Sequence, residues 1–231
     1  MLLFGLLIVT VTFLALGIWQ VQRMVWKHEL MARIETRVAA VPVTAPGPAR
    51  WPQITAADDE YTRVVLNGTY LHDREALVAA STERGPGYWV MTPLAQPDGT
   101  VVIVNRGFVT AERRSPVSRM GGQTPGPVAV LGLLRLSEAG AWILRQNDPQ
   151  ADRWYRRDPL QLGQARGLTR VAPYFVDAEA SPPGSEWPMG GMTRIRFSDN
   201  HFVYALTWFV LAALAAFAAA FVLRSEFRRA G

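Results

Sequence analysis

The chain has 231 residues, of which 49% are hydrophobic, and its formal net charge is +5. It contains no cysteine, which excludes disulfides, thiolate metal sites, c-type haem attachment and thiol redox chemistry. The arginines are scattered and form no dense basic tract. The charge therefore indicates attraction to anionic lipid head groups or carboxylates and no nucleic-acid partner.

Two long apolar runs lie near the ends of the chain. Leu2 to Val21 carries no charged side chain, and Phe202 to Leu223 is a second run of this kind. A helix of about 20 residues covers about 30 Å, the thickness of a bilayer's hydrocarbon core. The first run lacks the charged start and the small-residue cleavage site of a signal peptide, so we predict a retained anchor. We expect two antiparallel transmembrane helices, at residues 1–22 and 200–223.

Two spans place both termini on one side of the membrane. Local positive charge does not decide which side, because residues 23–37 and the tail at 224–231 are both basic. Long segments between spans translocate largely regardless of their charge. We therefore expect both termini in the cytoplasm, a cytoplasmic basic tail at 224–231, and the central domain outside.

The segment between the spans begins as a helix and then turns to β. Residues 23–40 continue the helical pattern as a juxtamembrane extension, and a Pro-rich, extended connector follows. Strands are predicted in "YTRVVLNGTYL", "EALVAAS", "GPVAVLGLLRLSE" and "VAPYFVDA". A hairpin is predicted around Pro97-Asp98-Gly99, and a short helix in "DPLQLGQARG" with Asp158 as N-cap. Residues 41–199 thus form an extracytoplasmic, mostly antiparallel β-rich domain, either a barrel or a sandwich.

Polar and aromatic residues gather where the two runs meet the same membrane face. Trp19, Arg23 and Trp26 share one helix face, and Lys27 follows them. Three residues share a face at the start of the second run: His201, Tyr204 and Trp208. The two faces could enclose an aromatic slot with a cationic edge. Farther along the second run, Ala212, Ala216 and Ala220 recur every four residues and predict a small-residue packing face.

An ordinary interfacial belt accounts for most of these residues, because Trp and Tyr gather at membrane interfaces and Arg and Lys snorkel there. His201 is not a typical belt residue. A neutral imidazole at this depth could hydrogen-bond the neighbouring helix or ligate a metal or haem iron. We expect His72 to be a surface turn residue and His28 a solvated helix residue. No hydrolytic or nucleophilic catalytic motif is present in the sequence.

Several blocks of the sequence match the motifs of a known family. The segment "LGIWQVQRMVWKHEL" fits the pattern G-x-W-Q-x-x-R-x-x-W-K-x-x-L in the first span. Further blocks of this kind are "GPGYWVMTPL", "VIVNRGFV", "ADRWYRRD", "APYFVDAE" and "NHFVYALTWF". Together these blocks resemble the surfeit locus protein one family of cytochrome c oxidase assembly factors. The resemblance covers almost the whole chain, and the blocks occur in the family's order.

The resemblance implies a non-enzymatic protein of a bacterial inner membrane that helps to mature a haem-copper oxidase. It implies transient binding of haem a, with the oxidase catalytic subunit and a haem a synthase as partners. Under this hypothesis His201 supplies the axial ligand to iron, Trp19, Tyr204 and Trp208 supply apolar walls, and Arg23 and Lys27 pair the propionates. Trp26 belongs to the same site, and Arg106 closes it from the side of the β-domain. The alternative is a scaffold that steadies the immature oxidase subunit without haem.

Overall fold

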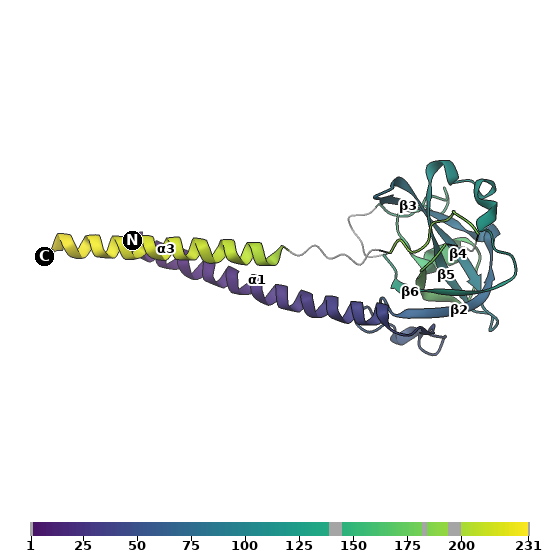
Figure 1. Ribbon diagram of the computed structural model, residues 1–231, viewed down its shortest axis with the longest axis horizontal. Helices are drawn as coiled ribbons and strands as arrows, with labels where there is room; N and C mark the ends of the chain where they lie inside the picture. Colours follow the sequence, from purple (N-terminus) through teal and green to yellow (C-terminus); the bar gives the residue numbers. More distant parts are fainter. Residues whose placement is uncertain (1, 139–144, 182–183, 194–199, 231) are drawn as a thin grey trace. The chain divides into compact units, whose positions relative to one another are not determined.

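The computed structural model describes residues 2–138, 145–181, 184–193 and 200–230 (Figure 1). The chain forms two compact units, of which one joins residues 1–35 and 195–231 and the other is residues 36–194. Helices α1 (Leu2–Ala39) and α3 (His201–Ala230) make up the first unit, and the last residues of α1 belong to the second. The predicted fold class, two apolar terminal helices flanking a β-rich domain, is confirmed.

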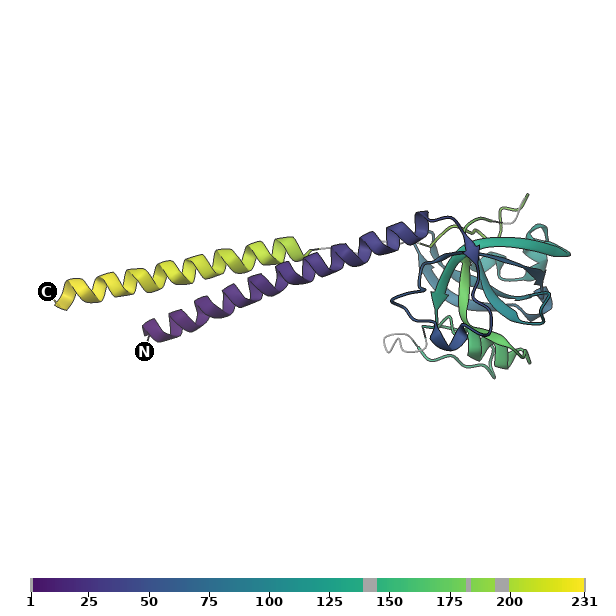
Figure 2. The ribbon, with the colours of Figure 1, turned by 90° about the horizontal axis from the view of Figure 1, so that it is seen from below.

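Helices α1 and α3 pack against each other in antiparallel directions (Figure 2). Each is long and apolar enough to cross a membrane. Gly17 of α1 lies at the point of close approach, where an added Cβ would be 2.6 Å from Cε1 of Phe209. A glycine here lets the helix backbones come together, as small residues commonly do between membrane helices.

The buried face of α3 differs from the predicted one. Ala205, Ala212 and Ala219 are buried, whereas Ala216 and Ala220 are exposed, so the expected repeat of four is wrong. In a helix with about 100° per residue, steps of four residues turn the position by about 40° each and leave the contact face. Steps of seven turn it by only about 20°, which is the periodicity that a pair of helices retains.

Seven strands form one sheet that closes on itself. They are β1 (Val43–Thr44), β2 (Arg63–Tyr70), β3 (Ala76–Thr82), β4 (Gly85–Ala95), β5 (Val101–Thr110), β6 (Pro127–Leu136) and β7 (Val171–Ala178). Their order is β1-β2-β6-β7-β5-β4-β3, and β2 also pairs with β4. Strands β2, β6, β7, β5 and β4 therefore make a closed barrel, while β1 and β3 extend it. Of the two architectures predicted, the structure is the barrel.

Most neighbouring strands are antiparallel, but β5–β7 and β1–β2 run parallel. The short strand β1 lies within the segment predicted as an extended connector. That segment is docked on the barrel, because the Pro46 carbonyl accepts hydrogen bonds from Nε1 of Trp51 (2.9 Å) and from the hydroxyl of Tyr174 (2.8 Å). Because the five strands close into a barrel, fewer strand edges are exposed and able to pair with other chains.

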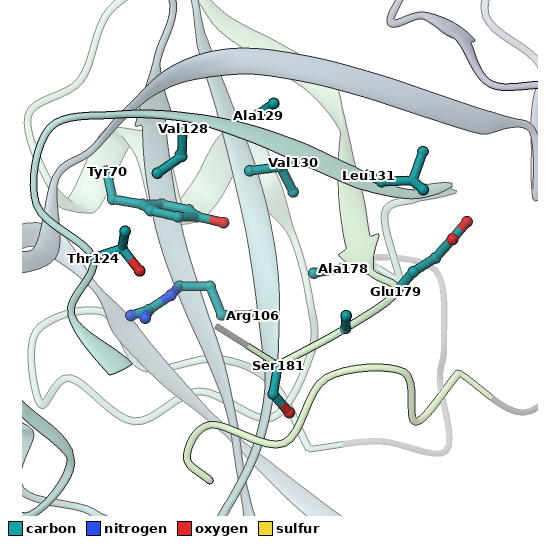
Figure 3. A pocket seen from close by; sticks show the side chains of 11 residues that line it. Tyr70, Arg106, Thr124, Val128, Ala129, Val130, Leu131, Ala178, Glu179 and Ser181 are labelled. Atoms are coloured by element: carbon teal, nitrogen blue, oxygen red, sulfur yellow. The ribbon is translucent and has the colours of Figure 1, made fainter. Parts of the chain in front are cut away.

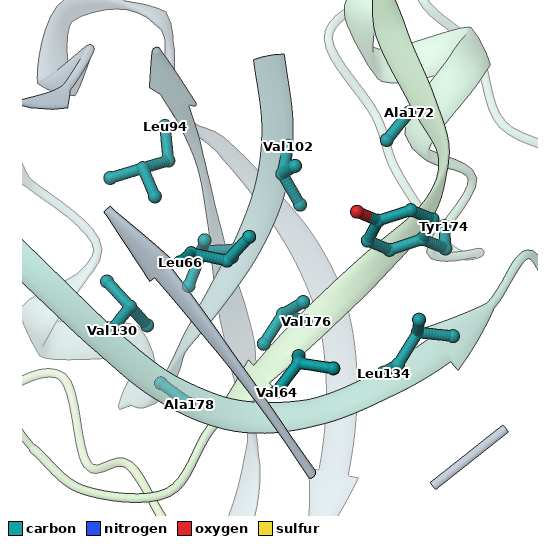
Figure 4. Close-up of a cluster of buried hydrophobic side chains, with 11 residues drawn as sticks. Val64, Leu66, Leu94, Val102, Val130, Leu134, Ala172, Tyr174, Val176 and Ala178 are labelled. Atoms are coloured by element: carbon teal, nitrogen blue, oxygen red, sulfur yellow. The ribbon is translucent and has the colours of Figure 1, made fainter. Parts of the chain in front are cut away.

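Alternation along the strands sends side chains to two hydrophobic cores. The barrel interior contains Val64, Leu66, Leu94, Val102, Val104, Val130, Leu134, Ala172, Tyr174, Val176 and Ala178 (Figure 4). A second core lies outside the barrel wall and contains Ala76, Val78, Met91, Ile103, Trp154, Leu162 and Phe175. Val102 and Val104 of β5 thus face inward and Ile103 faces outward.

The short helix α2 (Pro159–Ala165) forms as predicted. The carboxylate of Asp158 caps it by accepting a hydrogen bond from the backbone N–H of Gln161 at 3.1 Å. Gly167 follows the helix at φ +64°, a conformation that glycine adopts without strain. Among the described residues, four 3-10 helices connect the strands: η1 (Trp51–Gln53), η2 (His72–Arg74), η3 (Ala111–Arg113) and η4 (Pro116–Gly122).

Candidate functional site

His201, at the start of α3, is held by α1. Its Nδ1 lies 2.7 Å from Oε1 of Gln20. An amide oxygen only accepts hydrogen bonds, so Nδ1 carries the proton and donates it. In that tautomer Nε2 holds the ring lone pair, and metal-ligating histidines are commonly oriented by an oxygen in this way. The structure thus shows the hydrogen bond to the neighbouring helix, which was one of the two roles considered for His201 from the sequence. The same hydrogen bond is compatible with the other role, that of a ligand to iron.

The aromatic residues predicted around His201 lie on different faces of the helix pair. Trp208 is half-buried and its ring centroid is 5.5 Å from that of Phe13 on α1. Trp19, Trp26 and Tyr204 are 54%, 45% and 55% exposed. These three side chains point away from the contact between the helices. The exposure of these three side chains does not show the expected slot between α1 and α3, which stays a prediction.

The predicted cations of α1 also differ in their surroundings. The guanidinium of Arg23 stacks over the ring of Trp26 at 4.0 Å from its centroid, and both side chains are exposed. Lys27 is half-buried. The exposed face of α1 thus combines indole rings with one guanidinium.

Arg106 lies in the barrel unit, at one end of the barrel interior. In β5 every second side chain points into the barrel, and Val102 and Val104 are two of these. Arg106 comes two residues after Val104 and therefore lies on the same inward face. Trp89 of β4 pairs with Phe108 and Met91 pairs with Asn105, so β5 carries one extra residue, a β-bulge, at Arg106 and Gly107. Bulges re-aim side chains next to functional sites. Gly107, at φ +131°, also leaves room for the Met189 carbonyl, with which a Cβ would collide.

The guanidinium of Arg106 is buried, and no carboxylate of the described residues contacts it. The residue is 1% exposed. Nη2 donates to the Gly122 carbonyl, Nη1 lies 3.3 Å from Nδ1 of His72, and the Tyr70 ring lies 5.0 Å from the guanidinium carbon. Its Nε has no hydrogen-bond partner among the described residues. Burial lowers the pKa of Arg106, yet a guanidinium stays charged at neutral pH.

His72 was expected to be a surface turn residue. It does lie in a turn after β2, in η2, but its side chain is half-buried, with Nε2 3.0 Å from the Thr124 carbonyl. A carbonyl only accepts and a guanidinium only donates, so Nε2 is protonated and Nδ1 accepts from Arg106. The ring is therefore neutral. Desolvation by burial, together with the charge of Arg106, lowers the pKa of His72, in agreement with this geometry.

A cavity of about 520 Å³, named here the barrel-mouth cavity, opens beside Arg106 (Figure 3). It is lined by Tyr70, Arg106, Thr124, Val128, Ala129, Val130, Leu131, Ala178, Glu179, Ala180 and Ser181. Tyr70, Arg106 and Thr124 lie together at one side, with Val128 next to Tyr70, and Val130, Ala178 and Leu131 continue the lining away from them. Burial raises the pKa of Tyr70 to about 12, so its hydroxyl stays protonated at neutral pH. The site therefore presents hydrogen-bond donors next to an apolar wall.

A second polar cluster centres on Asp177 of β7, which is 2% exposed. Oδ1 accepts from Nδ2 of Asn105 (2.7 Å) and Nη1 of Arg157 (3.3 Å). Oδ2 accepts from Nη1 of Arg135 (3.1 Å) and Oγ1 of Thr193 (2.9 Å). The sequence analysis missed this cluster. The available signal was a charged residue inside the apolar strand "VAPYFVDA", directly after inward-facing Val176.

Within the described ranges, no group of three or more His, Asp and Glu side chains is arranged to hold a metal ion. A single imidazole, as at His201, can still be an axial ligand of haem iron, because the porphyrin supplies the other nitrogens.

Two apolar helices of spanning length and a five-stranded barrel between them define a membrane-anchored β-barrel protein. The SURF1 family model matches residues 7–213. Surfeit locus protein 1 of Homo sapiens is 33% identical over 229 residues, covering 90% of this chain and 73% of that protein. A SURF1-like protein of Monosiga brevicollis is 34% identical, with coverages of 98% and 89%. The chain therefore belongs to the SURF1 family.

Proposed function

We propose that this membrane protein is a non-enzymatic assembly factor for a haem-copper oxidase and holds haem a for the catalytic subunit. Family membership and the resemblance of its motifs to oxidase assembly factors support the oxidase role. The observation that carries the haem role is the contact between Nδ1 of His201 and Oε1 of Gln20, since an oxygen at this position orients the ring in the way common for metal-ligating histidines.

The residues of the helix pair fit the chemistry of haem a, an apolar macrocycle with anionic propionates and an iron that needs axial ligands. His201 would ligate the iron, and Gln20 would fix the direction of its ring. Trp208, packed on Phe13, would form an apolar wall next to it. When bound, haem a supplies the redox-active iron that the oxidase requires.

Exposed side chains on both helices would contact the rest of the haem. Trp19, Trp26 and Tyr204 offer flat apolar surface, and Arg23 and Lys27 offer positive charge for the propionates. Arg106 belongs to the barrel unit, and its closing of the haem site from the side of the β-domain stays a prediction. The oxidase catalytic subunit and a haem a synthase are the proposed partners, and both termini are proposed to face the cytoplasm of a bacterium.

The haem proposal is tested by purifying the full chain from cells that make haem a and recording its visible spectrum. We expect a Soret band that shifts or disappears in His201→Ala. His28→Ala is the matched control, because His28 is an exposed histidine of α1 away from Gln20. A wild-type protein without haem would contradict the carrier role and favour the haem-independent scaffold. A spectrum that is unchanged in His201→Ala would remove the ligand assignment.

The proposed orientation is tested with a reporter inserted at Gly99. This residue lies at φ +76° in the exposed turn between β4 and β5, where an insertion disturbs neither strand. We expect activity from a reporter that works only outside the cytoplasm. Activity from a reporter that works only in the cytoplasm would reverse the orientation.

A further inference from the structure

The barrel-mouth cavity contains a buried positive charge that the described residues do not neutralise. Arg106 contacts a carbonyl, a neutral imidazole and an aromatic ring, and none of these carries a negative charge. Its Nε–H is buried, and none of the residues that the structure describes accepts a hydrogen bond from it. A buried charge without a counter-ion and a buried donor without a partner are both unfavourable, so such groups in native proteins call for an explanation.

The neighbouring acidic side chains are engaged elsewhere. Glu179, which lines the cavity, is bound by Arg63 through two contacts of 2.7 Å. Glu75 is bound by the buried Arg119 through both of its carboxylate oxygens. The cavity therefore retains the positive charge of Arg106 and can attract an anion from outside.

The cavity's shape and lining restrict what that anion can be. About 520 Å³ lies within the range of small-molecule sites, and mouths of β-barrels commonly hold such sites. Val128, Val130, Leu131 and Ala178 give the cavity an apolar wall. The single positive charge of Arg106 would be neutralised by a ligand with one negative charge. A planar guanidinium also matches the geometry of a carboxylate. The side chains thus match an apolar molecule that ends in a single carboxylate.

We propose that the barrel-mouth cavity binds a small amphiphilic monocarboxylate, with its carboxylate beside the Arg106 guanidinium and its apolar body against β6 and β7. The Tyr70 hydroxyl and Thr124 flank the carboxylate, and exposed Ala129 and Ala180 form the rim. This site lies wholly within the barrel unit and does not rest on the proposed oxidase role.

The test is calorimetric titration of octanoate into the full chain in lipid nanodiscs, with empty nanodiscs as the blank. We expect saturable binding of octanoate and no saturable binding of octanol, which has the same chain without the charge. Arg106→Met should weaken octanoate binding by at least about tenfold, because it removes a charge-assisted hydrogen bond. Arg153→Met removes the same charge from an exposed position and should leave the affinity unchanged.

A second variant keeps the proposal testable if Arg106→Met does not fold. Ala180→Asp places a carboxylate at the exposed rim and leaves the contacts of Arg106 intact, and it should also weaken octanoate binding by at least about tenfold through charge repulsion. No binding to the wild type, equal binding of octanol, or full affinity in Ala180→Asp would each overturn the proposal.

Discussion

The cluster around Asp177 makes the sharpest prediction about what holds the barrel together. This carboxylate accepts hydrogen bonds from Asn105, Thr193 and two arginines, and it is 2% exposed. Asp177→Asn keeps the size of the side chain but removes the negative charge. It also replaces one acceptor oxygen with a donor that faces other donors. Arg135 and Arg157 then lose the counter-ion that they share, and each keeps only its second partner, Glu60 and Glu138 respectively.

Breaking a buried ion pair by removing one partner costs about 3–5 kcal/mol. A domain of this size loses roughly 2–4 °C of Tm for each kcal/mol, so the expected decrease is roughly 6–20 °C. The assay is thermal unfolding of the purified full chain followed by tryptophan fluorescence, which reports on the barrel through buried Trp154. Circular dichroism at low temperature establishes that the variant is folded.

The matched control is Asp148→Asn. Asp148 pairs with Arg153 at 3.6 Å, but the two side chains are 47% and 65% exposed. Exposed pairs contribute about 0–1 kcal/mol, so Tm should fall by less than about 4 °C. If both variants unfold at the same temperature, the buried network does not stabilise the barrel as argued.

Two further predictions concern the helix pair and His72. Gly17→Leu should reduce crosslinking between cysteines introduced at positions 13 and 208, because the added side chain meets the Phe209 ring, whereas Gly5→Leu, where nothing lies within 4 Å, should not. Equal crosslinking in both would refute the close approach. The pKa of His72 is lowered in the folded protein, so the unfolded chain binds more protons below its pKa of about 6.5 and stability falls as the pH drops through that value. The loss of Tm between pH 7.5 and 5 should be smaller in His72→Gln than in the wild type or in His28→Gln, and equal slopes would contradict this.

Local sequence signals predicted most of the secondary structure because each signal acts over a few residues. The hairpin turn is an example: Asp98 Oδ1 accepts from the backbone N–H of Thr100 at 2.9 Å, and Gly99 adopts φ +76°. The N-cap of α2 by Asp158 is another example. The turn and the cap each depend only on residues close together in the sequence, so the local pattern of residue types was sufficient to predict them.

Closure of the barrel and both polar sites depend on residues far apart in the chain. Asn105 and Asp177 are 72 positions apart, and they meet only because β5 and β7 are parallel neighbours. The Arg106 side chain points into the barrel because it lies on the same face of β5 as Val104 and because β5 has a β-bulge at Arg106 and Gly107. No local pattern contains the strand order, so the sequence could not distinguish a surface arginine from a buried one.

The first-span motif separates into two faces, and this changes how its residues can act. An α-helix turns by about 100° per residue about its axis. Gln20 therefore lies about 60° around the axis of α1 from Gly17, on the side that contacts α3. Trp19 and Trp26 lie about 160–180° from Gly17, on the exposed side. Gly17 and Gln20 thus join the helices and hold His201, whereas the indoles contact whatever lies outside the pair. Substitution of Trp26 should therefore leave the Gln20–His201 contact intact, so the contributions of the two faces to haem binding can be measured separately.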